Sequence, residues 1–279
     1  PGIYQPNLTQ HLIDTCEDRG DALAIIDLEG DFKPAAESTD SFKTRVDNAT
    51  VTATVNNLKD RSINSSYAAA YYPWVQILDP ISDRLVFTPP SVVALGTISN
   101  SQNKSELWFA PAGFNRGGLT GGGAGLPVVG ITQKLTSKQR DSLYEANINP
   151  IASFPSEGIV VFGQKTLQIT PSALDRINVR RLLIFLKKEV SKIANSILFD
   201  QNVQVTWNRF TGKVEPFLRS VQTGLGLTEF KIVLDSSTTT PDLVDRNILY
   251  AKIFLKPARA IEYIAIDFNI SNTGAAFDD

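Results

Sequence analysis

Seven glycines lie within the sixteen residues AGFNRGGLTGGGAGLP, from Ala112 to Pro127, and such a run could bind a phosphate. Glycine lets the backbone approach an anion and direct several N–H groups at it. A Walker A loop also needs a Lys-Ser or Lys-Thr pair after its last glycine, and a dinucleotide fingerprint needs G-x-G-x-x-G between a strand and a helix. Here the glycines lead to Leu126 and no such lysine follows. This pattern favours a flexible surface loop over a phosphate site.

The chain has one histidine, His11, and one cysteine, Cys16, and a thiol beside an imidazole can act as a nucleophile. Five positions on a helix turn the side chains by about 500°, so the two point to different faces. The pair also lacks the usual ligand set of a zinc site. Four carboxylates gather nearby: Asp14, Glu17, Asp18 and Asp21. Solvated charge is the simpler interpretation of that group, and the residues indicate no catalytic, cofactor or metal site.

The composition is that of a soluble globular protein of one or two domains, with 279 residues of which 42% are hydrophobic. The 27 basic and 29 acidic residues give a net charge of −2, so a charge-based partner would have to be recognised locally. A single cysteine fits a reducing compartment, and no apolar run approaches the roughly 20 residues of a membrane span. The missing methionine leads us to expect the C-terminal part of a longer protein.

Helices and strands are predicted to alternate along the chain. The expected helices cover residues 7–17, 34–61, 91–99, 136–147, about 174–198 and about 207–225. The expected strands cover 22–30, 66–80 with a bend at Pro73, 157–168, 229–235, 247–256 and 260–271. This order indicates an α/β (α+β) sandwich, in which helices flank a mixed β-sheet.

The helix expected at 174–198 has the clearest pattern. Its apolar stripe comprises Val179, Leu182, Leu183, Leu186, Val190, Ile193 and Ile197. The basic residues on the opposite side and its flanks are Arg180, Arg181, Lys187, Lys188 and Lys192. Two interpretations stay open, a solvated face and a surface that docks on an acidic protein. Nucleic acid is the weaker partner, because no aromatic residues interleave with these charges.

The last expected strand alternates in polarity. Its candidate pairing residues are Ile261, Tyr263, Ile264, Ile266, Phe268 and Ile270. Of these, Ile264, Ile266, Phe268 and Ile270 share one face of the strand. A proline-containing link, Lys256 to Arg259, precedes this strand. The strand can therefore fold back on its own sheet or extend and pair with the sheet edge of a neighbour. The second arrangement would produce a polymer.

Several segments, in this order, resemble the C-terminal region of the tail sheath proteins of contractile-tailed bacteriophages, the T-even-like group in particular. They are SSYAAAYYPWVQILDP (65–80), TPPSVVALG (88–96), LWFAPAGFNRGGL (107–119), YEANINPIASFPSEGIVVFGQKTL (144–167), INVRRLLIFLKKEV (177–190) and AKIFLKPARAIEYIAIDFNIS (251–271). One departure is the glycine-rich stretch at 117–125, which is longer than the family leads us to expect. In this context the glycines are interpreted as a connector that tolerates movement between subunits.

The resemblance implies a structural protein without a catalytic site. Its subunits would form hexameric rings, stacked helically around a tail tube protein, and would contract together to drive the tube through the host envelope. Terminal arms would add strands to the sheets of neighbouring copies. The resemblance divides the chain into a sheath core at 1–258 and a C-terminal arm at 259–279. The family's N-terminal arm and insertion domains are not recognisable here.

The partners implied are other copies of the chain, the tube, and the baseplate and tail terminator proteins, with no cofactor, nucleic acid or membrane contact. The implied location is the virion tail, after assembly in the bacterial cytoplasm. The leading hypothesis is that the strand at 261–271 pairs between subunits while the basic helix meets an acidic tube. A sheath of a secretion system or tailocin is one alternative, and a nucleotide-binding α/β enzyme is another.

Overall fold

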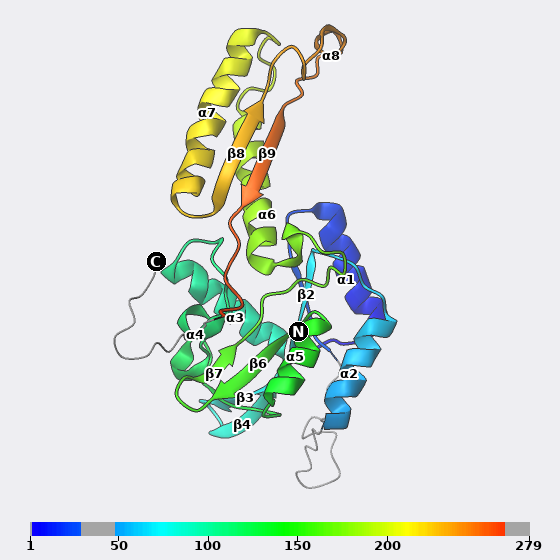
Figure 1. Cartoon of the computed structure of the whole chain (residues 1–279), viewed down its shortest axis with the longest axis vertical. Helices are drawn as coiled ribbons and strands as arrows, with labels where there is room; N and C mark the ends of the chain where they lie inside the picture. Colours follow the sequence, from blue (N-terminus) through cyan, green and yellow to red (C-terminus); the bar gives the residue numbers. More distant parts are fainter. Residues whose placement is uncertain (1, 29–47, 266–279) are drawn as a thin grey trace, which may run out of the picture.

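The computed structural model describes residues 2–28 and 48–265, which form two stacked parts (Figure 1). The helices are α1 (Pro6–Arg19), α2 (Asn48–Asp60), α3 (Pro90–Lys104), α4 (Gly113–Arg116), α5 (Ser137–Glu145), α6 (Ile177–Asn195), α7 (Gln204–Thr223) and α8 (Pro241–Asp245), with short 3-10 turns at Thr120–Gly122 and Ala173–Asp175. The strands are β1 (Ala24–Ile26), β2 (Ala68–Tyr72), β3 (Val75–Asp79), β4 (Arg84–Thr88), β5 (Val128–Ile131), β6 (Ile148–Phe154), β7 (Gly158–Val161), β8 (Leu227–Val233) and β9 (Lys252–Pro257).

The larger part is built around a four-stranded sheet with the order β1-β2-β6-β7. β1, β2 and β6 are parallel, and β7 returns antiparallel to β6. In β2, Ala68, Ala70 and Tyr72 point into one hydrophobic cluster, whereas Ala69 and Tyr71 point into another. The strand is buried on both faces because its side chains alternate between the two.

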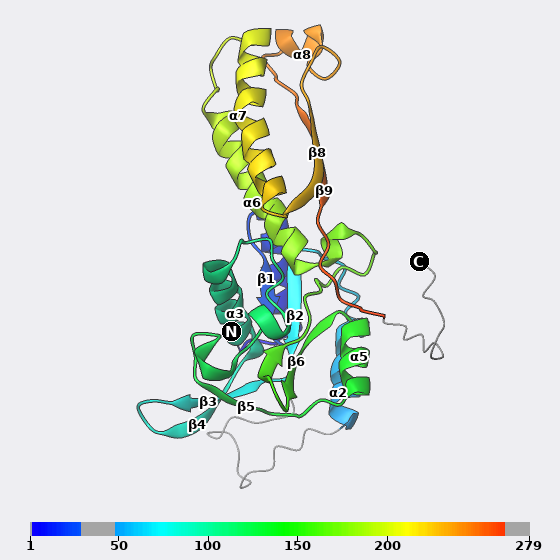
Figure 2. The ribbon, with the colours of Figure 1, turned by 60° about the vertical axis from the view of Figure 1, so that its left-hand side comes forward.

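Helices and a second sheet cover the two faces of this central sheet. The first cluster packs it against residues of α1, α2 and α5, and α2 and α5 lie side by side in Figure 2. The second cluster packs it against α3 and against β3 and β5, which belong to a three-stranded antiparallel sheet with the order β4-β3-β5. The predicted sandwich, with helices flanking a mixed sheet, is therefore confirmed.

Two of the motifs that carried the resemblance have structural roles here. The bond between Tyr72 and Pro73 is cis, and it separates β2 from β3, so the predicted bend ends one strand and starts another in a different sheet. Asn149 in β6 is fully buried. Its amide donates to the carbonyls of Ala70 (3.0 Å) and Lys165 (2.8 Å) and accepts from the Lys165 N–H (2.6 Å). It thereby ties β6 to β2 and to the segment after β7.

The smaller part contains α7, β8, β9 and most of α6, around a third hydrophobic cluster. β8 and β9 form a two-stranded antiparallel sheet whose one face packs on the helices, while the other face is uncovered in Figure 2. Trp108 of the larger part contacts this unit, and its indole N–H donates to the Gly224 carbonyl at the end of α7 (2.7 Å). A Cβ at Gly224 or Gly226 would press on the Trp108 ring, so both glycines permit the close approach.

The remaining expectations differ from the structure mainly in element bounds. The helix predicted at 34–61 is helical over 48–60, and residues 29–47 lie outside the described part of the chain. The helix predicted at 91–99 extends to Lys104. The strand predicted at 157–168 ends at Val161, and the one predicted at 247–256 begins at Lys252.

Candidate assembly surfaces

Helix α6 presents the predicted apolar stripe to the interior. Val179, Leu182 and Leu186 are buried, and the rest of the stripe is half-buried against α7, β8 and β9. The helix lacks a side-chain N-cap, so its stability depends on this packing and on its run of good helix formers. The prediction of a core-facing stripe is confirmed.

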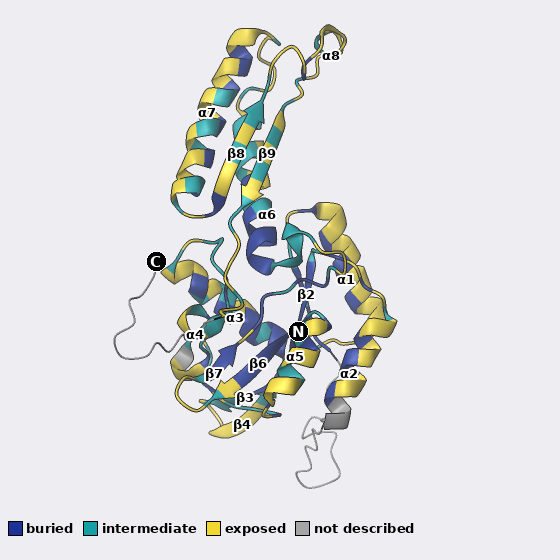
Figure 3. Cartoon of the chain, in the orientation of Figure 1, coloured by how far each residue is buried: buried dark blue, intermediate teal, exposed yellow. Residues whose placement is uncertain are grey.

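The interpretation of Arg180 and Arg181 as part of an exposed basic face is wrong. They are 7% and 8% exposed, because the N-terminal turns of α6 are surrounded by the larger part, as their dark blue colour in Figure 3 shows. The Arg180 guanidinium stacks on the Tyr67 ring and donates to the Ser66 hydroxyl. Arg181 donates to the Gln102 amide oxygen (3.1 Å). Burial lowers the pKa of both guanidinium groups, and their role is packing within the core.

Three lysines of the predicted basic set do lie on the surface. Lys187, Lys188 and Lys192, which we call the lysine face, are exposed further along α6. Lys192 pairs with Glu189 one turn away (2.6 Å), an ion pair that reduces the net positive charge of this face. The local positive charge is therefore smaller than the sequence indicates, and it is confined to the second half of the helix.

The last described residues, 258–265, leave β9 without joining a sheet. Residues 260–265 form no strand within the described structure, and Ile261, Tyr263 and Ile264 are 83%, 81% and 77% exposed. The other candidate pairing residues, Ile266, Phe268 and Ile270, lie outside the described residues. Large apolar side chains exposed in succession mark an interaction site, since removing them from water is favourable.

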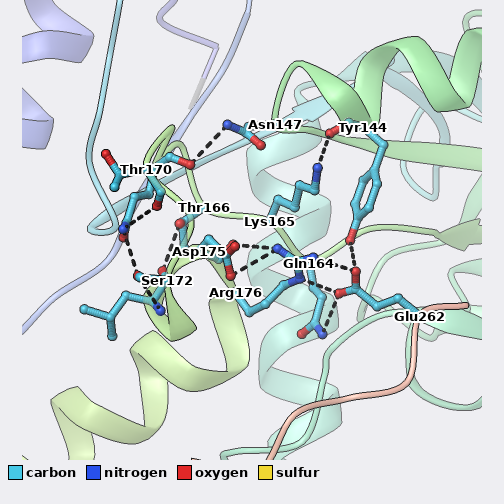
Figure 4. A network of polar contacts seen from close by, with 12 residues as sticks. Tyr144, Asn147, Gln164, Lys165, Thr166, Thr170, Ser172, Asp175, Arg176 and Glu262 are labelled. Carbon is cyan, nitrogen blue, oxygen red and sulfur yellow. Dashed lines mark hydrogen bonds and ion pairs between the residues drawn. The ribbon is translucent and has the colours of Figure 1, made fainter.

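One residue of this segment is attached to the core. Glu262 accepts two hydrogen bonds from Arg176, from Nε (2.6 Å) and Nη2 (2.8 Å), and one from the Tyr144 hydroxyl (2.9 Å) (Figure 4). The Gln164 amide donates a fourth (3.3 Å). Sequence reasoning missed this contact, because 86 positions separate Glu262 from Arg176 and no local pattern links them.

An apolar groove of about 360 Å³ lies beside β9. Its lining includes Leu183, Ile184, Val190, Ile253 and Leu255, together with Lys187. The edge of β9 away from β8 pairs with no other described strand. A free strand edge beside an apolar groove can accept an added strand, whose backbone pairs with the edge while alternate side chains fill the groove.

The first part of the glycine-rich segment is packed against the protein, so the interpretation as a flexible surface loop is wrong for residues 117–119, whereas Thr120, Gly121 and Gly125 do lie on the surface. Leu119 is fully buried, its N–H donates to the Ile159 carbonyl (2.8 Å), and the Val161 N–H donates to the Gly117 carbonyl (2.8 Å). A Cβ at Gly117 or Gly123 would collide with backbone atoms. These glycines let the backbone of the segment lie close to the edge of β7. The Leu119 N–H already donates a hydrogen bond within the protein.

The other chemical candidates are far from forming a site. Cys16 is buried and His11 is exposed, as the helical geometry predicts, and burial raises the pKa of the Cys16 thiol. Within residues 2–28 and 48–265, no three His, Cys, Asp or Glu side chains gather so as to hold a metal ion. None of the described helices has both the length and the apolarity to cross a membrane.

Solved structures of contractile injection systems share this fold. A chain of the anti-feeding prophage baseplate in its contracted state matches with a TM-score of 0.73 at 20% identity, over 94% of this chain and 69% of that chain. A chain of the anti-feeding prophage helical sheath in its contracted state matches with a TM-score of 0.66 at 21% identity, over 96% of this chain and 76% of that one. The protein thus has the fold of a class of subunits found in contractile machines.

Comparison with known sequences gives a more specific similarity than the fold does. Residues 170–271 match the family model of the phage tail sheath C-terminal domain. The chain is 32% identical over 243 residues to the tail sheath protein of Vibrio phage KVP40, covering 87% of this chain and 35% of the relative. It is 34% identical over 218 residues to the tail sheath protein of Enterobacteria phage T4, covering 78% and 32%.

The chain spans about a third of the length of the curated relatives it matches. The resemblance to the C-terminal region of T-even-like tail sheath proteins is confirmed, with residues 170–271 matching the phage tail sheath C-terminal domain.

Proposed function

We propose that this chain is part of a structural subunit of a contractile tail sheath, which polymerises as stacked rings around a tail tube and contracts to drive the tube through the host envelope. The observation that carries the proposal is the C-terminal segment, which leaves its own sheet with three large apolar side chains in water. A segment of this kind supplies a strand to another copy. The tail sheath relatives support the same conclusion.

The acceptor for this strand is the free edge of β9 and the groove between it and α6 in a second copy. The groove is lined mainly by aliphatic side chains, and the alternating segment 261–271 offers isoleucine and phenylalanine to fill it. The contact is heterologous, because the donor segment and the acceptor edge are different surfaces of the chain. Heterologous contacts propagate into rings or helices, as a sheath requires.

The deciding experiment removes residues 260–279 from the full-length protein. Electron microscopy should show that polymerisation with and without tubes is lost, while circular dichroism and a cooperative thermal transition show a folded core. A matched control deletes only the last four residues, which lie beyond the proposed strand. If the protein without residues 260–279 still assembled into normal sheath cylinders, the proposed role of the arm would be refuted.

The lysine face is a second proposed contact, directed at an acidic surface of the tube. Exposed lysines on a near-neutral chain recognise a partner by local charge complementarity, and salt screens such a contact. Reversal of Lys187 and Lys188 to Glu should weaken assembly on tubes, with a larger effect at low salt. Reversal of the exposed Lys104, at the end of α3, is the matched control. Equal tube binding by all variants would place the contact elsewhere.

The remaining roles follow from membership in such a tail. The proposed partners are other copies of the chain in hexameric rings, the tube protein, the baseplate and the tail terminator, and the proposed location is the virion after assembly in the bacterial cytoplasm. No catalytic role is assigned. The sheath of a related injection system is the second candidate, since the solved chains with this fold come from such systems. Purification of the native particle distinguishes the two candidates, because a genome-filled head would identify a phage tail.

A further inference from the structure

The Glu262 carboxylate lies in a binding site that the core builds from three separate segments. Tyr144 is in the last turn of α5, Gln164 follows β7, and Arg176 immediately precedes α6. Together they direct four hydrogen bonds at the two carboxylate oxygens. A planar guanidinium flanked by a hydroxyl and an amide donor matches a carboxylate in both charge and shape.

Further contacts hold the donors in place. The Asp175 carboxylate pairs with Arg176 Nη1 (3.1 Å), on the opposite end of the guanidinium from the Nε that Glu262 engages. The Lys165 ammonium lies 4.2 Å from the centre of the Tyr144 ring and donates to the Tyr144 carbonyl (2.7 Å). Figure 4 shows these groups converging from separate parts of the chain. The site is thus preorganised, and the arm contributes a single side chain to it.

The residues around Glu262 contribute little to the attachment. Within residues 259–265, the described hydrogen bonds and ion pairs all end at the Glu262 carboxylate. The Ala258 N–H, which donates to the Gly226 carbonyl (3.1 Å), is the preceding attachment. Glu262 is also the half-buried exception between exposed residues on either side.

We propose that this carboxylate site is the anchor from which the C-terminal arm is presented to the neighbouring copy. It fixes the exit point of the arm on the core, so that the residues that follow it start from one position and direction. Fixing one end of a segment lowers the entropy that its binding must overcome. The inference rests on the proposed arm function and adds Glu262, Arg176, Tyr144 and Gln164 as positioning residues.

Tryptic cleavage of the unassembled full-length protein tests the anchor directly. Arg259 is exposed and residues 260–279 contain no Lys or Arg, so a cut after Arg259 separates this segment from the core in one piece. Glu262→Gln should raise the release rate roughly tenfold, since it removes a charge-assisted pair of hydrogen bonds. Glu229→Gln, which removes an exposed carboxylate paired with Lys256, is the control and should be cut at the parent rate.

Two further variants show whether faster release reflects loss of the anchor or unfolding of the protein. Tyr144→Phe removes one donor and leaves the ion pair, so its release rate should lie between those of the parent and Glu262→Gln. Arg176→Gln removes the guanidinium while the Tyr144 and Gln164 donors remain, so its release should be at least as fast as that of Glu262→Gln. Release at the parent rate by Glu262→Gln or by Arg176→Gln would overturn the carboxylate anchor.

An assembly assay distinguishes the proposed anchor from the proposed arm function on which it rests. Glu262→Gln should raise the protein concentration needed for assembly several-fold, whereas removal of residues 260–279 should abolish assembly. An unchanged threshold combined with faster cleavage would overturn the positioning role and leave the arm function intact. Normal assembly without residues 260–279 would refute the arm function itself, whatever the cleavage rates.

Discussion

The guanidinium of Arg180 lies 4.0 Å from the centre of the Tyr67 ring. Arg180 belongs to a basic run in the sequence, yet its side chain packs inside the core. Arg180→Lys should destabilise the protein by about 1–2 kcal/mol, because an ammonium cannot both stack on the ring and reach the Ser66 hydroxyl. Urea unfolding measures this loss. Lys188→Ala, on the exposed part of the same helix, should change stability by less than about 0.5 kcal/mol. Equal effects at the two positions would contradict the assignment.

Gly96 and Gly212 should respond in opposite directions to the same substitution. Both lie inside helices, where Ala is normally more stable than Gly by about 1 kcal/mol. At Gly212 a Cβ meets nothing within 4 Å, so Gly212→Ala should stabilise by about 0.5–1 kcal/mol. At Gly96 it would collide with the backbone of Ala124, so Gly96→Ala should destabilise. Thermal unfolding of the two variants would refute the packing of the glycine-rich segment if both gained stability.

Asp27 should be the most sensitive carboxylate near the start of the chain. It is 2% exposed and accepts hydrogen bonds from the Gly2 N–H (2.6 Å), the Ser91 N–H (2.9 Å) and the Ser91 hydroxyl (2.7 Å). Asp27→Ala leaves these donors unpaired and should cost about 2–3 kcal/mol in chemical denaturation. Asp14→Ala, at an exposed position on α1, is the control and should be nearly neutral. A neutral Asp27→Ala would show that Asp27 is not needed to hold these two segments together.

Alkaline pH should weaken the fold through two tyrosines. Burial raises the pKa of Tyr71, and burial together with the neighbouring Glu262 carboxylate raises the pKa of Tyr144. The folded state therefore keeps protons that the unfolded chain releases near pH 10, so stability is retained below about pH 10 and falls as the pH rises further. Urea midpoints between about pH 8 and pH 11 should show this fall, and Tyr144→Phe should flatten it. Tyrosinate absorbance of the folded protein near pH 10 from both residues would contradict it.

Periodicity predicted the elements that pack along their whole length. The stripe from Val179 to Ile197 predicted α6 correctly, because one continuous face of that helix meets the core. It could not predict that the first turns are enclosed on every side, since the covering groups come from Tyr67 and Gln102, which are distant in sequence. The same limit explains the errors at Arg180 and Arg181.

Composition was a poor guide to the glycine-rich segment. A mobile loop and a backbone pressed against a strand edge both favour glycine, and only the contacts of Gly117 and Gly123 distinguish them. The Glu262 site lay beyond sequence reasoning for a related reason, because its donors come from three segments that the fold alone brings together.

Helix α6 has Ile177 in the core of the larger part and Leu182 and Leu186 in the core of the smaller part. Its 19 residues make a rod of roughly 28 Å, and bending it would break backbone hydrogen bonds. A load applied to the outer end of the rod is therefore delivered as torque to the central sheet. Rotation of the smaller part is thus transmitted through α6 to the central sheet, and the two parts turn together.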